Sequence, residues 1–363
     1  MNLKNSEQAV LALRNLYEQY GYLPFKMSRF EEYDLYVQNK DFLISDQVIT
    51  FSDRNGRLLA LKPDVTLSII KNAIDNPGHI QKLYYNENVY RIDKGTQSFK
   101  EILQSGLECV GDLGEYEVAE VMLLAAKSLS IMGKSFVLDI SHTGLVETVI
   151  SQCAFSEAEH VQAITCLRQK NRNALAQICE NCGQAEKLIA LVNYNGTPEK
   201  VLSKIRSLMT DPCEIEAIDS LERVCRFLMR QGFEQNIRID FSVGSDMNYY
   251  GGFVFKGYLE GVPTSILSGG QYDKLLRKMG KTSKAIGFAV YLDLLQRLDS
   301  ATFDVDQVLL YDSLSDTGSL LTVAESLRND GSLLVTTTPP LNRSWSKLYR
   351  YQDGEAVLIE KNG

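Results

Sequence analysis

The segment 102–110, ILQSGLECV, places two polar side chains among apolar ones at a spacing that suits ligand binding. Successive side chains of a strand point to opposite faces, so Gln104, Gly106 and Glu108 would share one face. Gly106 would leave room between the amide and the carboxylate for something to approach the backbone. A carboxylate and an amide around such a gap suit an ammonium group, an imidazole or a hydroxyl. The alternative is an ordinary solvent-facing side of a sheet.

Three more polar residues could complete a binding site. Arg91 ends the preceding strand-like segment, and an arginine can hold a carboxylate or a phosphate through two parallel hydrogen bonds. Tyr250 stands in the run NYYGG, and Tyr272 follows a pair of glycines where the pattern changes from strand to helix. That glycine-rich run does not match the dinucleotide-binding pattern GxGxxG. Taken alone, the arginine is better explained as a surface ion-pair partner, and each tyrosine as a core or rim residue.

The elements that would position these residues follow from hydrophobic periodicity and turn residues. The pattern predicts a helix over 1–23, a hairpin over 47–61 that turns at Asn55-Gly56, and a helix that begins near Pro63. It then predicts two strands within 80–112, joined by a polar loop, and a helix over 114–131. Residues 144–233 show helical patterns only, and strands resume after them.

The C-terminal part of the chain reads as a separate small unit. The run DQVLLYDS predicts a strand, GSLLTVAESLRNDG a helix that Gly331 caps, and SLLVTTT a second strand. We therefore expect a core over residues 1–300 with a helical insertion at about 146–235, followed by a small α/β domain over 303–363.

Composition limits the kinds of partner. The 363 residues carry a net charge of −8, whereas a nucleic-acid binder usually shows a basic patch, so we expect no tRNA partner. No apolar run approaches the roughly 20 residues that span a bilayer, and the N-terminus lacks the apolar core of a signal peptide. We expect a cytoplasmic protein. The Cys179–Cys182 pair has no second ligand pair at suitable spacing, which predicts structural thiols and no metal site. We also expect no cofactor.

In chain order, several segments resemble the histidyl-tRNA synthetase family and its non-catalytic paralogue, the regulatory subunit of ATP phosphoribosyltransferase, over about residues 5–300. LYEQYGYLPFKMSRFEEYD is similar to motif 1, and LLALKPDVTLSII to the segment with the Arg-Pro-Glu/Asp-x-Thr signature. VYRIDKGTQSFKEILQSGLECVG is similar to motif 2 and SDMNYYGGFVFKGY to the histidine-specific loop. LSGGQYDKLLRKMGKTSKAIGFAVYLDLL is similar to motif 3. The resemblance implies an α+β fold of the class II aminoacyl-tRNA synthetase type, with an antiparallel sheet and flanking helices, that forms dimers through motif 1.

Position by position, the resemblance implies a pocket for free histidine. Asp64 and Thr66 would meet the amino group, and Arg91 would face the carboxylate. Gln104 and Glu108 would also line the pocket. Two phenols would reach the imidazole, those of Tyr250 and Tyr272. Such a set suits a zwitterion whose ring both donates and accepts hydrogen bonds.

The departures from the family concern ATP. Amino-acid activation brings a carboxylate onto the α-phosphate of ATP, so fixed cations must stabilise the transition state. The synthetases use three arginines for this, of which Arg91 keeps the first. The second falls at Ser245 and the third at Leu294, with Arg297 three residues further on as a shifted substitute. Other family positions are also changed: Ser28 in motif 1, Asp93-Lys94-Gly95 in motif 2 and Gln271 before the motif 3 tyrosine.

A kept histidine pocket and lost activation chemistry imply a histidine sensor rather than an enzyme. The resemblance implies a regulatory subunit in histidine biosynthesis that binds the short-form catalytic subunit of ATP phosphoribosyltransferase, and free L-histidine would mediate feedback inhibition. The core would be a homodimer within a hetero-oligomer. Two alternatives stay open: a divergent histidyl-tRNA synthetase with relocated cations, and a module that senses something else, such as uncharged tRNA.

Overall fold

The computed structural model describes residues 5–43, 48–92, 98–180, 182–244, 250–297, 305–312, 315–341 and 343–362. Two of the expected departures, Ser245 and the run Asp93-Lys94-Gly95, lie outside these residues. The chain divides into two compact units, Met1–Leu298 and Asp299–Gly363. Each unit is described by itself.

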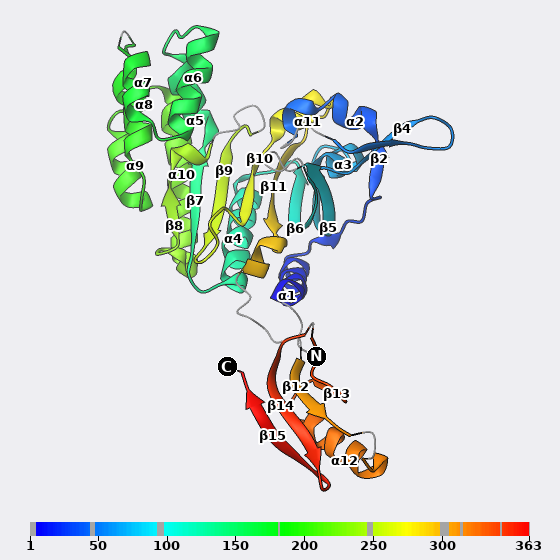
Figure 1. Cartoon of the computed structure of the whole chain (residues 1–363). Helices are drawn as coiled ribbons and strands as arrows, with labels where there is room; N and C mark the ends of the chain where they lie inside the picture. The colour runs from blue at the N-terminus through cyan, green and yellow to red at the C-terminus, as the bar shows by residue number, and fades with distance from the viewer. Residues whose placement is uncertain are drawn as a thin grey trace. The chain divides into compact units, whose positions relative to one another are not determined.

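The first unit is built on an eight-stranded sheet whose strands all pair antiparallel except at its two edges (Figure 1). There β1 runs parallel to β5, and β8 runs parallel to β7. In spatial order the strands are β1 (Leu23–Pro24), β5 (Ile80–Ile92), β6 (Phe99–Gly111), β11 (Lys284–Tyr291), β10 (Leu267–Gln271), β9 (Phe253–Leu259), β7 (Phe136–His142) and β8 (Ile237–Ile239). The predicted antiparallel α+β architecture is confirmed.

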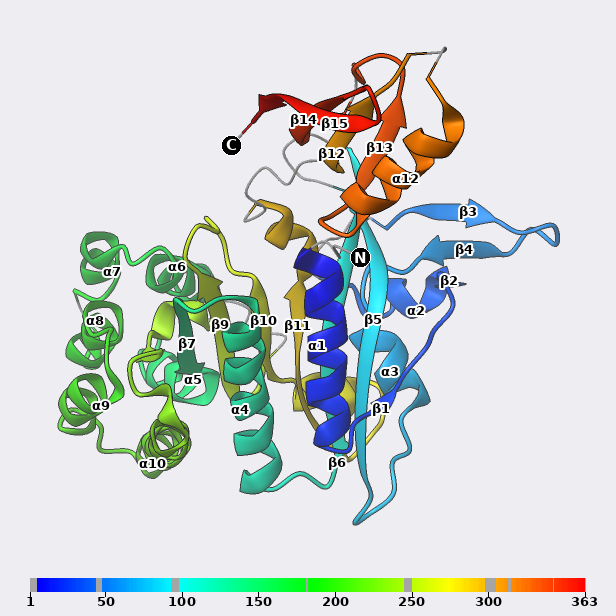
Figure 2. The same cartoon turned by 90° about the horizontal axis from the view of Figure 1, so that it is seen from below.

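Alternation along β6 separates the two faces of this sheet. Leu107 and Cys109 pack in the core cluster that contains α1 (Asn5–Gln19) and α4 (Glu115–Met132). Figure 2 shows these two helices side by side across the sheet. Val110, with its even-numbered neighbours, packs instead with α3 (Thr66–Asn72) and α11 (Asp273–Lys278). The even-numbered face of β6 is therefore the one that the polar residues share.

Two helix boundaries differ from those that the sequence predicted. Helix α1 ends at Gln19 rather than near residue 23, because Gly21 turns the chain with a left-handed φ of +79°. Helix α3 begins at Thr66 rather than at Pro63, and the carboxylate of Asp64 accepts the backbone N–H of Leu67 at 3.0 Å. A side chain that bonds a first-turn N–H holds its own residue outside the helix.

The predicted hairpin is confirmed and forms part of a second, small sheet. β3 (Thr50–Ser52) pairs antiparallel with β4 (Leu58–Leu61), and β4 also pairs with β2 (Phe30–Glu32), which precedes the short helix α2 (Tyr33–Val37). Gly56 takes a φ of +79° at the turn. The Asp53 carboxylate stabilises the turn by accepting the backbone N–H of Asn55 at 2.7 Å and of Arg57 at 2.9 Å.

A run of helices stands between β7 and β8, where the sequence predicted a helical insertion. Its helices are α5 (Thr143–Ser151), α6 (Glu157–Arg168), α7 (Arg172–Ile178), α8 (Ala185–Asn193), α9 (Pro198–Arg206) and α10 (Pro212–Leu228). Helix α10 packs against α5, α4 and α9, which joins the insertion to the rest of the first unit.

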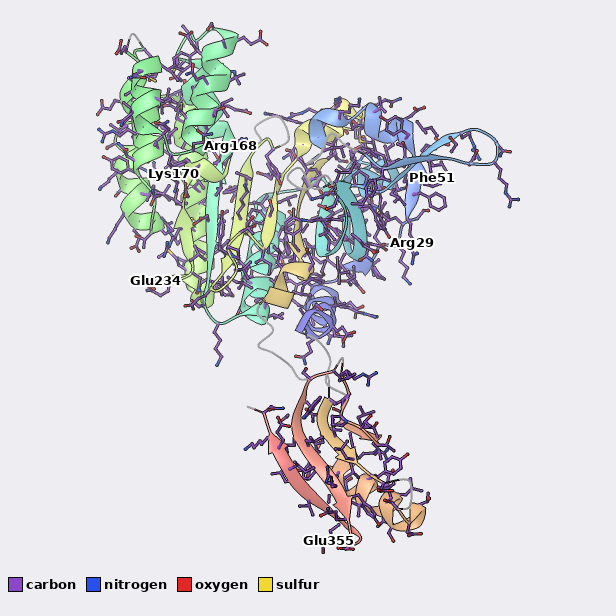
Figure 3. The ribbon with its side chains drawn as sticks, in the orientation of Figure 1. Arg29, Phe51, Arg168, Lys170, Glu234 and Glu355 are labelled. Carbon is purple, nitrogen blue, oxygen red and sulfur yellow. The ribbon has the colours of Figure 1, made fainter. Side chains whose placement is uncertain are left out.

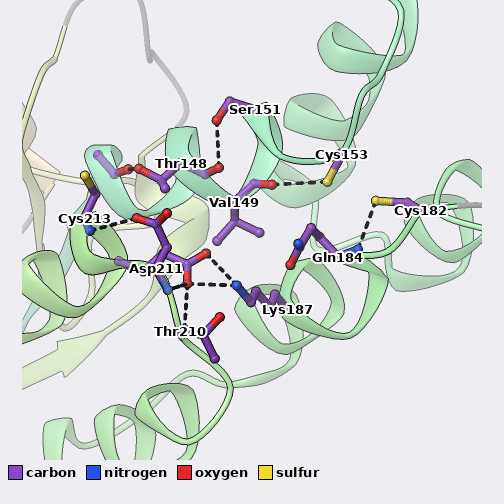
Figure 4. Close-up of polar contacts among 12 residues, drawn as sticks. Thr148, Val149, Ser151, Cys153, Cys182, Gln184, Lys187, Thr210, Asp211 and Cys213 are labelled. Atoms are coloured by element: carbon purple, nitrogen blue, oxygen red, sulfur yellow. Dashed lines mark hydrogen bonds and ion pairs between the residues drawn. The ribbon is translucent and has the colours of Figure 1, made fainter.

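One buried carboxylate ties the insertion helices together. Glu214 is fully buried at the start of α10, and both of its oxygens accept the Lys187 ammonium of α8 at 2.8 Å. The same carboxylate accepts the backbone N–H groups of Thr210 and Asp211 at 3.0 and 3.1 Å (Figure 4). Such a carboxylate is stabilised inside the protein only while its partners are present.

In its described residues, the second unit has a four-stranded sheet and the helix α12 (Thr317–Arg328). Its strand order is β13 (Leu333–Thr336), β12 (Val305–Leu310), β14 (Trp345–Gln352) and β15 (Glu355–Lys361). Sequence reasoning missed β14, because the run RSWSKLYRY is mildly basic and shows no clear alternation. Its position between two strands buries Leu348. Among the described residues of both units, no helix is long and apolar enough to cross a membrane.

Replacing Lys187 with alanine should destabilise the insertion strongly. The change leaves the Glu214 carboxylate buried without its counter-charge, which typically costs about 3 kcal/mol or more of the free energy of unfolding. Urea unfolding followed by circular dichroism measures this cost. Lys200→Ala, at an exposed lysine of α9, is the matched control and should stay within about 0.5 kcal/mol of the parent. Equal stability of the two variants would contradict the role given to this ion pair.

Candidate ligand-binding site

A cavity of about 520 Å³ lies over the even-numbered face of β6. Its volume falls in the range typical of small-molecule sites, roughly 300–1,000 Å³. All of the predicted site residues line it: Asp64, Thr66, Arg91, Gln104, Glu108, Tyr250 and Tyr272. These residues come from segments more than 200 positions apart, and the sheet register brings them together. The identity of the ligand stays a prediction.

Small residues of β10 and β11 form the floor of this cavity: Ser268, Gly269, Gly287 and Ala289. Gly106 lies opposite Ala289 of β11, which lies opposite Ser268 of β10. The role of Gly106 differs from the one predicted, because a Cβ there would stand 2.5 Å from the Tyr85 hydroxyl. The gap between Gln104 and Glu108 therefore accommodates a tyrosine of the neighbouring strand rather than a ligand.

Glu108 is the central acid of the site. It is buried, and its Oε1 accepts the Thr66 hydroxyl at 2.7 Å while its Oε2 accepts the Tyr272 hydroxyl. Gly287 stands opposite on β11, and a side chain there would overlap the Glu108 carboxylate. Burial raises the pKa of Glu108 to about 8, although the Tyr272 and Thr66 hydrogen bonds favour the ionised form. A ligand N–H at this carboxylate would favour ionisation further.

Asp64 and Arg91 form the second charged group of the site. Burial raises the pKa of the Asp64 carboxyl, while the nearby Arg91 guanidinium and the backbone N–H of Leu67 favour its ionised form. Arg91 donates from Nε to the Pro63 carbonyl at 2.9 Å. This hydrogen bond fixes the guanidinium beside the loop that carries Asp64.

Gln104 offers a donor at the floor of the cavity. Its side chain is 2% exposed, and its Nε2 has no hydrogen-bond partner within the part of the chain that the structure describes. A buried amide donor without a partner costs about 1–3 kcal/mol, which an acceptor atom of a ligand would recover. Gln104 is thus suited to bind a carboxylate oxygen.

The two tyrosines stand on the β10 side of the cavity. Tyr272 is buried directly after β10, where its hydroxyl reaches Glu108. The Tyr250 ring packs on the same strand, since a Cβ at Gly270 would lie 2.5 Å from its Cδ1. The glycine pair that the sequence singled out therefore lets aromatic rings approach the strand closely.

The positions that depart from the synthetases have structural partners of their own. Leu294 lies in the 3₁₀ segment Leu292–Arg297 and packs against the apolar core. Gln271 Oε1 accepts the Phe253 N–H at 2.8 Å, and Ser28 Oγ accepts the Phe30 N–H at 3.3 Å. None of these three residues lines the cavity.

Sequence reasoning missed two cations in the cavity wall, Arg168 of α6 and Lys256 of β9. Helix α6 contributes Val161, Ile164 and Thr165 as well. These positions are spaced i, i+3, i+4 and i+7, which is one face of a helix. The spacing was visible in the sequence, but nothing in it indicated that this face turns toward the sheet.

Comparison with known proteins places the chain in a family. Residues 1–295 match the family model described as histidyl-tRNA synthetase. The chain therefore belongs to the histidyl-tRNA synthetase family and has its class II aminoacyl-tRNA synthetase-like fold. Within this family it groups with the ATP phosphoribosyltransferase regulatory subunits. It is 30% identical over 288 residues to that of Thermoanaerobacter pseudethanolicus, a match covering 77% of this chain and 75% of the relative.

Solved structures agree in fold. An ATP phosphoribosyltransferase regulatory subunit/histidyl-tRNA synthetase from Bacillus halodurans C superposes with a TM-score of 0.73 at 22% identity, covering 92% of this chain and 88% of that one. A chain of the ATP phosphoribosyl transferase (HisG:HisZ) complex from Thermotoga maritima gives 0.64 at 18% identity, covering 80% of this chain and 98% of that one. At such identities these matches concern the fold alone.

Replacing Glu108 with glutamine should make stability less dependent on pH. The carboxyl has a pKa of about 8 in the folded protein against 4.5 as its ordinary value. Between these values the unfolded chain binds fewer protons than the folded one, so the Glu108 contribution to stability is full below pH 4.5 and is lost as pH rises toward 8. Glutamine removes that loss.

Urea unfolding at several pH values across this window tests the prediction. The free energy of unfolding of Glu108→Gln should fall less steeply with pH than that of the parent. Glu157→Gln, at an exposed carboxylate of α6, is the matched control and should follow the parent. Identical pH slopes for the parent and Glu108→Gln would contradict the assignment.

Proposed function

We propose that this chain is a non-catalytic regulatory subunit of ATP phosphoribosyltransferase. It would be required by the short-form catalytic subunit, and it would mediate feedback inhibition by histidine in histidine biosynthesis. Membership of the family supports the proposal, as does the fold that the chain shares with a component of the Thermotoga maritima complex. Catalysis would reside in the partner subunit, and the core would form a homodimer within the hetero-oligomer.

The observation that carries the proposal is a contrast between two sets of positions. The residues that the family resemblance assigns to histidine share one cavity. Leu294, where the resemblance places a cation that the synthetases need for activation, packs instead against the apolar core. An aliphatic side chain cannot stabilise the charge that develops when a carboxylate meets a phosphate.

Free L-histidine fits the chemistry of the cavity. Its ammonium group would meet Asp64 and Thr66, and its imidazole would lie between Glu108 and the two phenols. The Gln104 amide would donate to the carboxylate. Each polar group of the ligand would then have a partner, as buried polar groups require.

Regulation requires one further property. Histidine inhibits the complex only if it binds two of its states with unequal affinity, because a ligand shifts an equilibrium by no more than its differential affinity. The complex with the catalytic subunit is therefore the form in which inhibition must be measured.

Isothermal titration calorimetry on the purified chain, alone and with a short-form catalytic subunit, tests the proposal. L-histidine should bind, and Asp64→Asn and Glu108→Ala should weaken binding by about tenfold or more, because each removes an acceptor of a charged or buried donor. Glu157→Gln is the matched control. Histidine should also inhibit the phosphoribosyltransferase activity of the complex.

Two results would contradict the proposal. If histidine binds neither the chain nor its complex, the chain is not a histidine sensor. If the chain supports histidine-dependent exchange of pyrophosphate into ATP, it is instead a divergent synthetase.

A further inference from the structure

Two cations of the cavity stand apart from its acids. Arg168 and Lys256 line the wall formed by α6 and β9, whereas Asp64 and Glu108 lie over β6. Within the described parts of the chain, neither cation has an ion pair or a side-chain hydrogen bond. Other cations nearby do have partners: Lys170, two residues after Arg168, pairs with Asp240 at 2.6 Å.

The sheet register places Lys256 in line with the cavity floor. The cross-strand row runs from Gly106 through Ala289 and Ser268 to Lys256. Because adjacent strands are about 4.8 Å apart, the Lys256 backbone lies two strands, or roughly 10 Å, beyond that of Ala289. The small residues between them leave space for the long lysine stem. Its other neighbour in the row, Asp139 of β7, forms no ion pair with it.

Contacts of helix α6 hold Arg168 at the same cavity that Lys256 lines. The helix packs against the 3₁₀ segment Phe241–Val243, and the Lys170–Asp240 pair fixes the chain just beyond its end. Figure 3 shows Arg168 and Lys170 at the end of the helix that lies toward the sheet. Val243 lines the cavity too, so α6 and this segment form one wall.

The charged residues of the cavity indicate which kind of ligand would bind at the wall that Arg168 and Lys256 line. Arg91 is already engaged on the acid side, where its Nε donates to the Pro63 carbonyl and its charge favours the ionised form of Asp64. Arg168 and Lys256 have no such partner among the described residues, and they line the same cavity as the carboxyl groups of Asp64 and Glu108. A ligand that matches this arrangement is a zwitterion, with its ammonium toward the acids and its anionic group toward the wall.

We propose that Arg168 and Lys256 bind the carboxylate of the amino acid in the cavity, with Gln104 donating from the floor. The inference rests on the proposed function and deepens it, because it transfers the carboxylate contact from Arg91 to the wall. Arg168 would also link occupancy of the cavity to helix α6 and hence to the helical insertion. The cation that the family supplies at the position of Ser245 would here be supplied by the insertion.

Calorimetry with two ligands tests this assignment. L-histidinol keeps the imidazole and the ammonium group of L-histidine but has a hydroxymethyl group in place of the carboxylate. Arg168→Gln and Lys256→Gln should each weaken histidine binding by about tenfold, as loss of a charge-assisted hydrogen bond does. Histidinol affinity should stay within about twofold of the parent, which also shows that the site is folded. Arg172→Gln, at an exposed arginine of α7, should change neither affinity.

Several outcomes overturn the inference. If both glutamine variants bind histidine as tightly as the parent does, Arg168 and Lys256 are not part of the histidine site. An equal loss of histidine and histidinol binding would mean that they act on the fold of the cavity and not on the carboxylate. Inorganic phosphate that binds the parent and not Arg168→Gln, with histidine binding unchanged, would assign the wall to a separate anion. If the parent itself ignores histidine, alone and with the catalytic subunit, the proposed function fails first.

Discussion

The buried carboxylate of Glu108 joins three parts of the first unit that are distant in the sequence. It stands on β6, accepts Thr66 from the start of α3 and accepts Tyr272 from the turn between β10 and α11. Because a carboxylate inside a protein needs donors on its oxygens, the two short helices are held against the sheet at one point. Gly287 opposite it provides the space that this arrangement requires.

The acidic side chains of the cavity and two of its basic side chains lie on different sides of it. Acids and hydroxyls gather over β6 and α3, where burial raises the pKa values of Asp64 and Glu108. The opposite wall carries Arg168 and Lys256. A zwitterionic ligand would therefore direct its carboxylate toward this wall and its N–H groups toward the acids.

The proposed loss of activation chemistry and the proposed ligand contacts are compatible within one fold because they depend on different elements. The proposed ligand contacts come from β6, α3 and the turn after β10, which pack around Glu108. The family resemblance assigns the third activating cation to the segment after β11, where Leu294 adds apolar contact to the core. That position could therefore become aliphatic without disturbing the residues around Glu108.

The sequence by itself determined most of the elements of the first unit and the shared face of Gln104 and Glu108. Alternation predicted that Gln104 and Glu108 share a face, and the Asn55-Gly56 turn predicted the hairpin, because both signals are local. Tertiary structure alone decided that Tyr85 occupies the space at Gly106 and that Arg168 faces the cavity. These depend on strand register and on the packing of α6 against Phe241–Val243, contacts between residues far apart in the chain. No local pattern specifies such contacts, so the cationic wall was visible only in the folded molecule.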